Sequence, residues 1–184
     1  MIDLQKVNFP LPVYGEHVKI DLFCENNITN EYLNWLNDPI VVKFSKQREE
    51  QHTYQTSLKF LNSYIKSQND IFLAIYLKNE NTYIGTMTIN FSDEYKEAEL
   101  RILIGEKKYW GKGLGKDSWG VMLNSLLAIH GLNKVFAGAV ESNAAMIEIM
   151  HDSGMALEKI MDDYDFLDGR SQKALIFSKF ANKR

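Results

Sequence analysis

The sequence predicts a mixed α and β fold in a single domain that spans residues 1–184. Near-continuous apolar runs such as IFLAIYL, which begins at Ile71, are typical of strands buried on both faces of a sheet. Other stretches carry apolar residues at helical spacing, among them Leu58, Leu61 and Ile65. A chain of 184 residues is most often one domain, and it is long enough to bury a sizeable core.

The expected elements follow the order strand, two helices, three strands, helix, strand, helix and two strands. Residues 1–17 are expected to be irregular, because prolines and a glycine interrupt them. Thr29 is the expected N-cap of the first helix, and Asn143 or Ser142 that of the last. We expect helices over 27–37, from 53 to about 67, after the glycines of 109–119 and over 144–155. We expect strands over 18–23, 71–77, 82–91, 99–105, 134–140, 157–166 and 173–180, the last two joined by a turn at Asp168-Gly169.

The composition argues against several classes of partner. The net charge is −3 and the pI is near 5.8, which gives no footprint for general nucleic-acid binding. Cys24 is the only cysteine, so no internal disulfide can form and a reducing compartment is expected. The N-terminus lacks the apolar core of a signal peptide, and the longest uncharged stretch, 118–133, is too short to span a membrane. We therefore expect a cytoplasmic protein that binds neither nucleic acid nor a membrane.

The stretch YWGKGLGKDSW, residues 109–119, is the most informative part of the chain. Its glycines Gly111, Gly113 and Gly115 stand between an apolar run and a helical pattern. A turn of this kind points backbone N–H groups outward at the positive end of a helix dipole, where phosphate binds well. Four lysines surround it in a chain of negative net charge: Lys107, Lys108, Lys112 and Lys116. Taken alone, the glycines could equally form only a tight turn, with the lysines as a solvated face.

Two common nucleotide motifs do not fit this stretch. The signature G-x-x-x-x-G-K-[ST] is excluded because Trp110 stands at its first glycine and Asp117 replaces the hydroxyl residue. The fingerprint G-x-G-x-x-G is excluded because Ser118 stands at its last position. The spacing [Q/R]-x-x-G-x-[G/A] fits better, with Trp110 in the first place, followed by Gly113 and Gly115.

These residues resemble the GNAT superfamily of acetyl-CoA-dependent N-acetyltransferases. The resemblance rests on AELRILIGEKKYWGKGLG, on ESNAAMIEIMHDSGM and on NWLNDPIV near the start. It is greatest for the branch of ribosomal-protein N-terminal acetyltransferases and nucleotide-amino-sugar acetyltransferases, in which a tryptophan-glycine pair looks typical. It implies the GNAT fold: a mostly antiparallel sheet of about seven strands, flanked by about four helices and splayed between the fourth and fifth strands.

The resemblance also implies acetyl-CoA as cosubstrate, with no metal. In the family, the strand before the glycines carries a bulge and separates from the next strand, and the pantetheine arm lies in the gap like an added strand. Here that strand offers the backbone of Ile102, Leu103 and Ile104, and Asn143 matches a family asparagine near the pantetheine arm, although it could also be a plain helix cap. The implied phosphate-binding residues are Trp110, Gly111, Lys112, Gly113, Leu114, Gly115 and Lys116.

The catalytic groups are less well defined. Many family members use a tyrosine as general acid on the helix after the asparagine, and Met150 stands there in this chain. Glu99 is the first candidate for the general base, and Glu141, with its neighbour Ser142, is the second. An exposed strand-end carboxylate is an equally good reading of Glu99, and Ser142 could simply cap a helix. Arg101 stands where the branch usually has glycine.

The acceptor site is expected between the two early helices, the connection over 37–51 and the late strand pair. The candidate lining residues are Trp35, Asn37, Phe44, Arg48, Tyr83 and Tyr164, of which Arg48 would suit a phosphate or carboxylate. The preferred function is acetyl transfer to a small primary amine such as a nucleotide-linked amino sugar. The alternatives are a protein N-terminus as acceptor and a CoA-binding module without catalysis. Either a monomer or a homodimer is compatible with the sequence.

Overall fold

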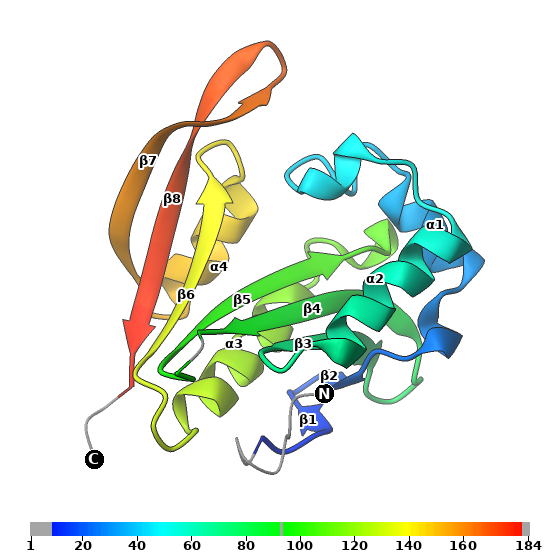
Figure 1. Cartoon of the computed structure of the whole chain (residues 1–184), viewed down its shortest axis with the longest axis horizontal. Coiled ribbons are helices and arrows are strands. Elements are labelled where there is room, and N and C mark those ends of the chain that lie inside the picture. The colour runs from blue at the N-terminus through cyan, green and yellow to red at the C-terminus, as the bar shows by residue number, and fades with distance from the viewer. Residues whose placement is uncertain (1–8, 93, 182–184) are drawn as a thin grey trace.

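A computed structural model describes residues 9–92 and 94–181 (Figure 1). Its eight strands form one sheet in the order β1-β2-β3-β4-β5-β6-β8-β7. The strands are β1 (Val13–Tyr14), β2 (Val18–Leu22), β3 (Asp70–Leu77), β4 (Tyr83–Phe91), β5 (Glu97–Ile104), β6 (Lys134–Val140), β7 (Ala156–Leu167) and β8 (Arg170–Phe180). The helices are α1 (Asn30–Leu36), α2 (Tyr54–Lys66), α3 (Leu114–Leu127) and α4 (Ala144–Asp152), with short 3-10 turns η1 (Glu25–Asn27), η2 (Lys46–Glu49) and η3 (Lys107–Tyr109).

The fold confirms the predicted class, a mostly antiparallel sheet flanked by four helices. The sheet has one strand more than expected, because β1 forms within the stretch of 1–17 that was predicted to be irregular. Val13 is buried there and pairs with Ile20 of β2. That part of the prediction is wrong for Val13–Tyr14, and residues 1–8 lie outside the described residues.

The splay expected between the fourth and fifth strands is confirmed. Because β1 adds a strand at the start, these two strands are β5 and β6 of the structure. These two strands are parallel and pair only over three positions, Glu97–Glu99 with Lys134–Phe136, after which they separate (Figure 1). The expected bulge in β5 is wrong, because its pairing with β4 runs without a shift from Phe91–Ala98 to Gly85–Ile104. The gap therefore arises where the short pairing with β6 ends, and not from an irregularity of β5.

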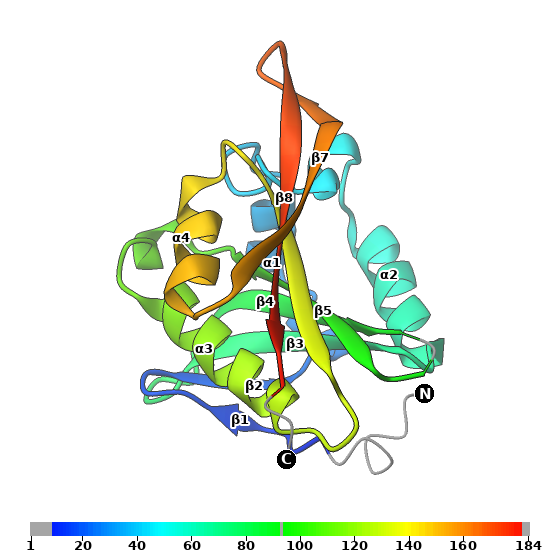
Figure 2. The same cartoon turned by 90° about the vertical axis from the view of Figure 1, so that its left-hand side faces the viewer.

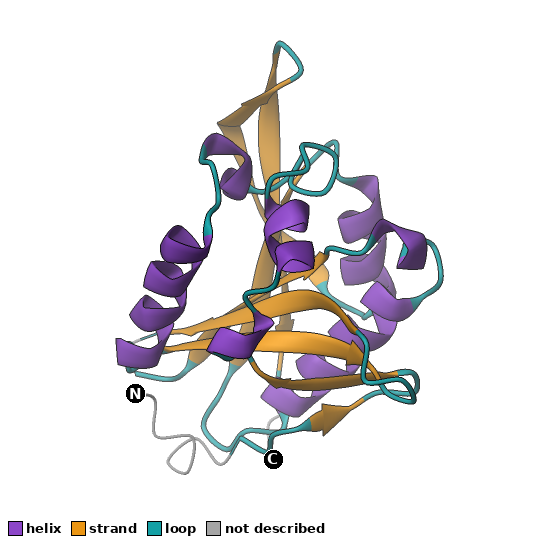
Figure 3. Cartoon of the chain, turned by 90° about the vertical axis from the view of Figure 1, so that its right-hand side faces the viewer, coloured by secondary structure: helices purple, strands orange, loops and turns teal. Residues whose placement is uncertain are grey.

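Helices cover both faces of the sheet (Figure 3). Successive side chains of β3 point to opposite faces of the sheet and pack against different helices. Ile71, Leu73 and Ile75 belong to the apolar cluster that contains α3. Phe72 and Ala74 belong to the cluster around α1. Figure 2 shows α3 and α4 on one side of the sheet and α2 on the other. Each strand of the central sheet can therefore present different chemistry to its two faces.

The β7–β8 hairpin extends beyond the rest of the molecule (Figure 2). Its strands are joined by Asp168 and Gly169, with φ of 50° and 77°, the left-handed conformations that a two-residue hairpin turn requires. β7 is an edge strand and is exposed over most of its length. The turn that the sequence predicted is thus confirmed, and it projects a long arm past the end of β6.

The helix starts follow the expected capping chemistry. Thr29 accepts a hydrogen bond from Tyr32 N at the start of α1, and Asn143 accepts one from Met146 N at the start of α4. Asn143, and not Ser142, is therefore the N-cap of the last helix.

Candidate active site

The glycine stretch forms an open turn at the start of α3. Gly113 is the N-cap of α3 with φ of +78°, and Gly111 has φ of +71°, values that favour glycine. A Cβ atom at either position would meet nothing within 4 Å, so the space in front of the turn is free. The first N–H groups of a helix have no partner within the helix. The turn therefore presents unpaired donors to an open space, which suits a diphosphate.

Two helix starts lie at the wide end of the gap between β5 and β6. Because the two strands are parallel, their carboxyl ends lie at the same edge of the sheet, and α3 and α4 begin shortly after them. A Cβ at Gly115 would lie 3.5 Å from Ile149 of α4 and 3.6 Å from Ile104 of β5, so the three elements meet there. The gap, the glycine turn and α4, which begins at the Asn143 cap, are therefore neighbours.

The Trp110 side chain binds the last residue of β5. Its indole Nε1 donates to the carbonyl oxygen of Ile104 over 2.8 Å, while the side chain remains 42% exposed. The carbonyl of Ile104, one of the groups expected to face the pantetheine arm, is therefore already bound. Ile102 and Leu103 are half-buried and lie on the part of β5 that has no partner on the β6 side.

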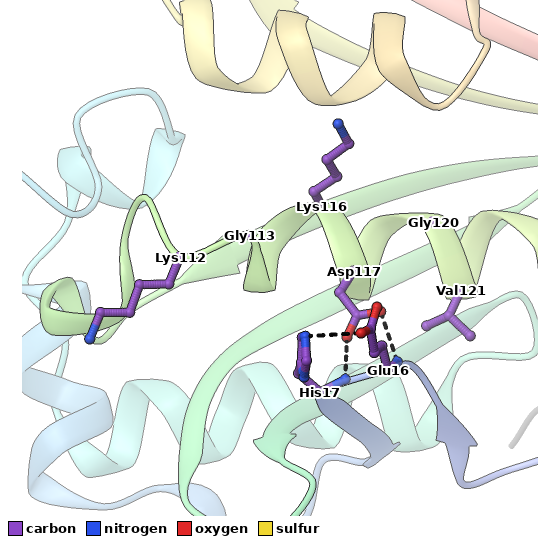
Figure 4. Close-up of a pocket in the computed structure, with 8 residues that line it drawn as sticks. All are labelled: Glu16, His17, Lys112, Gly113, Lys116, Asp117, Gly120 and Val121. Carbon is purple, nitrogen blue, oxygen red and sulfur yellow. Dashed lines mark hydrogen bonds and ion pairs between the residues drawn. The ribbon is translucent and has the colours of Figure 1, made fainter.

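The lysines of the turn do not converge on one point. Lys116 lies 2.6 Å from Asp152 of α4, and this hydrogen bond raises the pKa of Lys116 and lowers that of Asp152. Lys112 lies 5.5 Å from the ring centre of Tyr109. Figure 4 shows Lys112 and Lys116 pointing away from each other, on either side of Gly113. In this arrangement they contribute positive charge on different sides of the turn.

A cavity of about 400 Å³ lies beside the turn, where the β1–β2 connection meets the start of α3 (Figure 4). The carboxylate of Asp117 accepts backbone hydrogen bonds from Glu16 (3.0 Å) and His17 (2.7 Å). A Cβ at Gly15 would lie 2.5 Å from this carboxylate, so a side chain there would displace Asp117 from these hydrogen bonds. Sequence reasoning missed this contact because its partners are about 100 residues apart. The cavity is lined by Glu16, His17, Lys112, Gly113, Lys116, Asp117, Gly120 and Val121.

Glu99 lies on the face of β5 opposite α3. Its neighbours Ala98 and Leu100 are buried in the cluster that contains α3, and successive strand residues point to opposite faces. Arg101, on the same face, binds both oxygens of Glu99, with Nε at 3.0 Å and Nη2 at 2.7 Å. The Glu99 side chain is 23% exposed, so it is partly accessible and already paired.

The structure does not bring Glu141 and Ser142 to Glu99. Glu99 pairs with Phe136, and Glu141 follows five residues further along, about 16 Å away at the usual rise per strand residue. One oxygen of Glu141 accepts the backbone N–H of Lys173 over 3.0 Å. Glu141 and Ser142 are exposed at the wide end of the gap, so one reacting atom cannot touch both carboxylates.

Met150 is fully buried in the cluster that contains α3. The position that carries a tyrosine in many members of the family is therefore part of the apolar core of this chain. It offers no proton to a leaving group.

Several residues expected around the acceptor have partners within the protein. Asn37 donates to the carbonyl oxygens of Leu33 and His52 and accepts from His52 N, which ties the end of α1 to the start of α2. Trp35 and Tyr83 pack together with ring centres 5.0 Å apart, and burial raises the pKa of Tyr83.

Arg48, which would suit an acidic group of the acceptor, binds Asp165 of β7 in this structure. Phe44 and Tyr164 are 38% and 45% exposed, and they remain candidates for contact with an acceptor.

Within residues 9–92 and 94–181, no three His, Cys, Asp or Glu side chains are placed to hold a metal ion. None of the helices in the described part of the chain is long and apolar enough to cross a membrane.

Comparison with known proteins identifies the family. The model of the acetyltransferase (GNAT) domain matches residues 25–156. An uncharacterized protein of Methanocaldococcus jannaschii is 27% identical over 126 residues, which cover 68% of this chain; the match spans only a quarter of that longer protein.

Two solved structures share the fold. A spermidine N-acetyltransferase from Vibrio cholerae, in complex with CoA and spermine, has a TM-score of 0.79 at 16% identity and covers 90% of this chain and 96% of its own. A ribosomal L7/L12 alpha-N-protein acetyltransferase in complex with coenzyme A has a TM-score of 0.76 at 12% identity and covers 94% and 97%. The family match covers most of the chain and includes both the glycine turn and the Asn143 helix start. The chain belongs to the GNAT acetyltransferase family.

Proposed function

We propose that this protein transfers an acetyl group from acetyl-CoA to the primary amine of a small molecule, such as a nucleotide-linked amino sugar. The observation that carries this proposal is the open glycine turn at the start of α3, beside the gap between β5 and β6. A diphosphate fits the unpaired N–H groups of such a turn, and an extended chain fits the unpaired edge of β5. In CoA, a diphosphate is followed directly by the extended pantetheine arm.

The residues have separate roles in this proposal. The backbone of 111–115 binds the pyrophosphate, with Lys112 and Lys116 as flanking charge. Ile102 and Leu103 offer backbone groups to the pantetheine arm. Asn143 uses its side-chain oxygen to cap α4, which leaves its amide nitrogen as the part that would contact the arm. Trp110 has a supporting role, since its indole nitrogen holds the end of β5.

The reaction joins the amine nitrogen to the carbonyl carbon of the thioester and breaks the carbon–sulfur bond. The amine must be uncharged when it attacks, so a base has to take a proton from it. Glu99 is the proposed base, because it lies near the narrow end of the gap on the face opposite α3. The leaving thiolate takes its proton from solvent in this scheme, since Met150 has none to give. The products are an acetylated amine and CoA as the free thiol.

The choice of a small amine over a protein N-terminus is part of the proposal. By their names, one of the two similar enzymes acts on a polyamine and the other on a ribosomal protein. Both classes of acceptor, a small amine and a protein N-terminus, therefore occur on this fold. The placement in the branch that includes nucleotide-amino-sugar acetyltransferases, the cytoplasmic location and a monomeric or homodimeric state are proposed with it. A CoA-binding module without catalysis is the alternative, favoured by the buried Met150.

Titration calorimetry with acetyl-CoA tests the first part of the proposal. A thiol-release assay tests the second, with glucosamine, a nucleotide-linked amino sugar, spermidine and a hexapeptide with a free amino terminus as acceptors. Binding of acetyl-CoA followed by turnover on a small amine is expected. Binding without turnover on any acceptor would favour the silent module, and absence of binding would contradict both functions.

A further inference from the structure

The loop between α1 and α2 is tied to the β7–β8 hairpin by three contacts, which we call the clasp. One guanidinium nitrogen of Arg48 lies 2.6 and 2.8 Å from the two carboxylate oxygens of Asp165. A second ion pair, of 2.8 Å, and a cation–ring contact of 5.6 Å join the same two segments. In the clasp, Lys43 of the loop pairs with Asp168 of the hairpin, Lys46 lies over the ring of Tyr164, and Arg48 binds Asp165.

The clasp joins the two sides of the molecule that flank the gap between β5 and β6. The loop belongs to the α1–α2 side, whose apolar cluster packs on β3, and the hairpin follows β6 in the sheet order. The gap lies between these two walls, and Figure 1 shows the loop, in cyan, and the hairpin, in orange, at its upper end. Glu99 points to the same face of the sheet that the loop covers. A contact between the walls therefore closes the space between them beyond the end of β6, on the same face of the sheet as the proposed base.

The Arg48–Asp165 pair is the strongest part of the clasp. Its side chains are 19% and 13% exposed, whereas those of Lys43 and Asp168 are 44% and 73% exposed. An ion pair shielded from water, with a planar guanidinium on a carboxylate, is stronger than an exposed one between flexible side chains. Arg48 also donates to the carbonyl oxygen of Ser45 over 3.0 Å, which fixes the guanidinium to its own loop.

Gln172, beside the clasp, has a poorly satisfied side-chain amide. It faces Asp165 across the two strands of the hairpin and is 8% exposed. Its side-chain oxygen has no hydrogen-bond partner among the described residues, and its nitrogen makes only a long bond of 3.4 Å. A buried amide oxygen without a donor disfavours the state that buries it. The hairpin thus carries an unsatisfied buried amide next to the ion pair of the clasp.

We propose that the clasp makes Arg48 and Asp165 specificity-determining residues that limit the size of the acceptor. A small amine reaches Glu99 beneath the closed bridge. A protein N-terminus has to enter as an extended chain between the two walls, where the Arg48–Asp165 pair blocks it. The inference rests on the proposed acetyl transfer and deepens it, because it gives a structural reason for a small acceptor.

The variant Asp165→Asn tests the clasp, and Asp162→Asn is its matched control. Asp162 lies on the same strand and pairs with Lys173 over 2.9 Å, but this pair stays within the hairpin. The probes are the fastest small amine of the thiol-release panel and the hexapeptide. In Asp165→Asn we expect kcat/KM for the hexapeptide to rise at least about fivefold relative to the small amine. KM for acetyl-CoA should not change, and the control Asp162→Asn should behave as the wild type. Exchanging the two charges (Arg48→Asp with Asp165→Arg) should restore the wild-type ratio of kcat/KM for the hexapeptide to that for the small amine.

Amide hydrogen exchange over 43–50, in the protein without substrates, reports on the clasp itself. Exchange should be faster in Asp165→Asn and unchanged in Asp162→Asn. Unchanged exchange in Asp165→Asn would show that the loop is held by other contacts and would overturn the proposal. Turnover with an unchanged ratio of the two probes would also overturn it and leave the acetyl transfer standing. A wild-type protein that acetylates no probe, or prefers the hexapeptide, would refute the proposed function and the clasp together.

Discussion

Glu99 and Arg101 form the pair of residues on which the proposed chemistry depends most. They lie two positions apart on β5, so they share a face of the sheet, and the guanidinium binds both oxygens of the carboxylate. A carboxylate held in this way is oriented, but an amine has to share it with Arg101. The sequence makes this pair predictable, because residues i and i+2 of a strand point to the same face. The position of Glu99 relative to the gap is not predictable in this way, because it depends on the register between β5 and β6.

Replacing Glu99 with glutamine should lower kcat by about 10²- to 10⁴-fold, because the amide cannot take the proton of the amine. Cofactor affinity, measured by calorimetry, should be nearly unchanged. Glu97→Gln is the matched control, since Glu97 lies on the same face of the same strand and pairs with Lys134. A loss of less than about tenfold in Glu99→Gln would remove Glu99 from the base role.

Replacing Gly113 with aspartate should abolish binding of acetyl-CoA. The new carboxylate would fill the open space in front of the turn and repel the pyrophosphate, and the φ of +78° would strain the side chain. Gly131→Asp is the control, because Gly131 also has a positive φ, of +91°, and open space around its Cβ position. Calorimetry that gives the same affinity for Gly113→Asp as for the wild type would contradict the assignment of the turn.

At the scale of the elements, α3 is held in place from its two sides. Asp117 receives two backbone hydrogen bonds from the β1–β2 connection, and Lys116 reaches Asp152 of α4. The first contact joins the glycine turn to a part of the chain about 100 residues earlier. No local pattern predicts it, because Asp117 looks like an ordinary acidic residue in the first turn of a helix. β1 was missed for the same reason, since two residues carry no periodicity.

Asp117→Asn should lower the free energy of unfolding by about 1–2 kcal/mol, because hydrogen bonds to a charged acceptor are replaced by weaker ones to an amide. Asp152→Asn, which removes only an exposed ion pair, should lower it clearly less than Asp117→Asn does. Urea denaturation of both variants measures the difference. Equal effects in the two variants would indicate that the β1–β2 connection is not anchored through Asp117.

The contact between the hairpin and the α1–α2 loop should weaken in acid. Burial raises the pKa of Asp165, but hydrogen bonds from Arg48 and the backbone of Phe166, with the positive charges of Arg48 and Lys46, lower it overall. A carboxyl group with a lowered pKa in the folded state stabilises fully above its unfolded pKa of about 3.9 and loses this contribution as the pH falls through the folded value. The stability difference between wild type and Asp165→Asn should therefore be full at pH 6 and shrink below about pH 4. A pH-independent difference in urea denaturation would contradict this origin.

At the scale of the whole molecule, the order of elements was enough to predict a mixed α and β chain, and the resemblance to the GNAT superfamily supplied the antiparallel sheet and its splay. Apolar runs such as 71–77 and 134–140 became central strands, and the caps at Thr29 and Asn143 start helices. The site was predictable as far as it is local, in the glycine turn and the helix after it. Its remaining features depend on contacts between distant segments, such as Arg48 with Asp165. Such contacts follow from the closed fold and leave no mark on the sequence near either residue.

A structure determined with acetyl-CoA bound would test the central claim most directly. The account predicts the pyrophosphate within hydrogen-bond distance of the backbone N–H groups of 111–115. It also predicts the pantetheine arm between β5 and β6 and the thioester carbon on the side of Glu99. A nucleotide bound away from the glycine turn, or an empty gap at saturating acetyl-CoA, would contradict it.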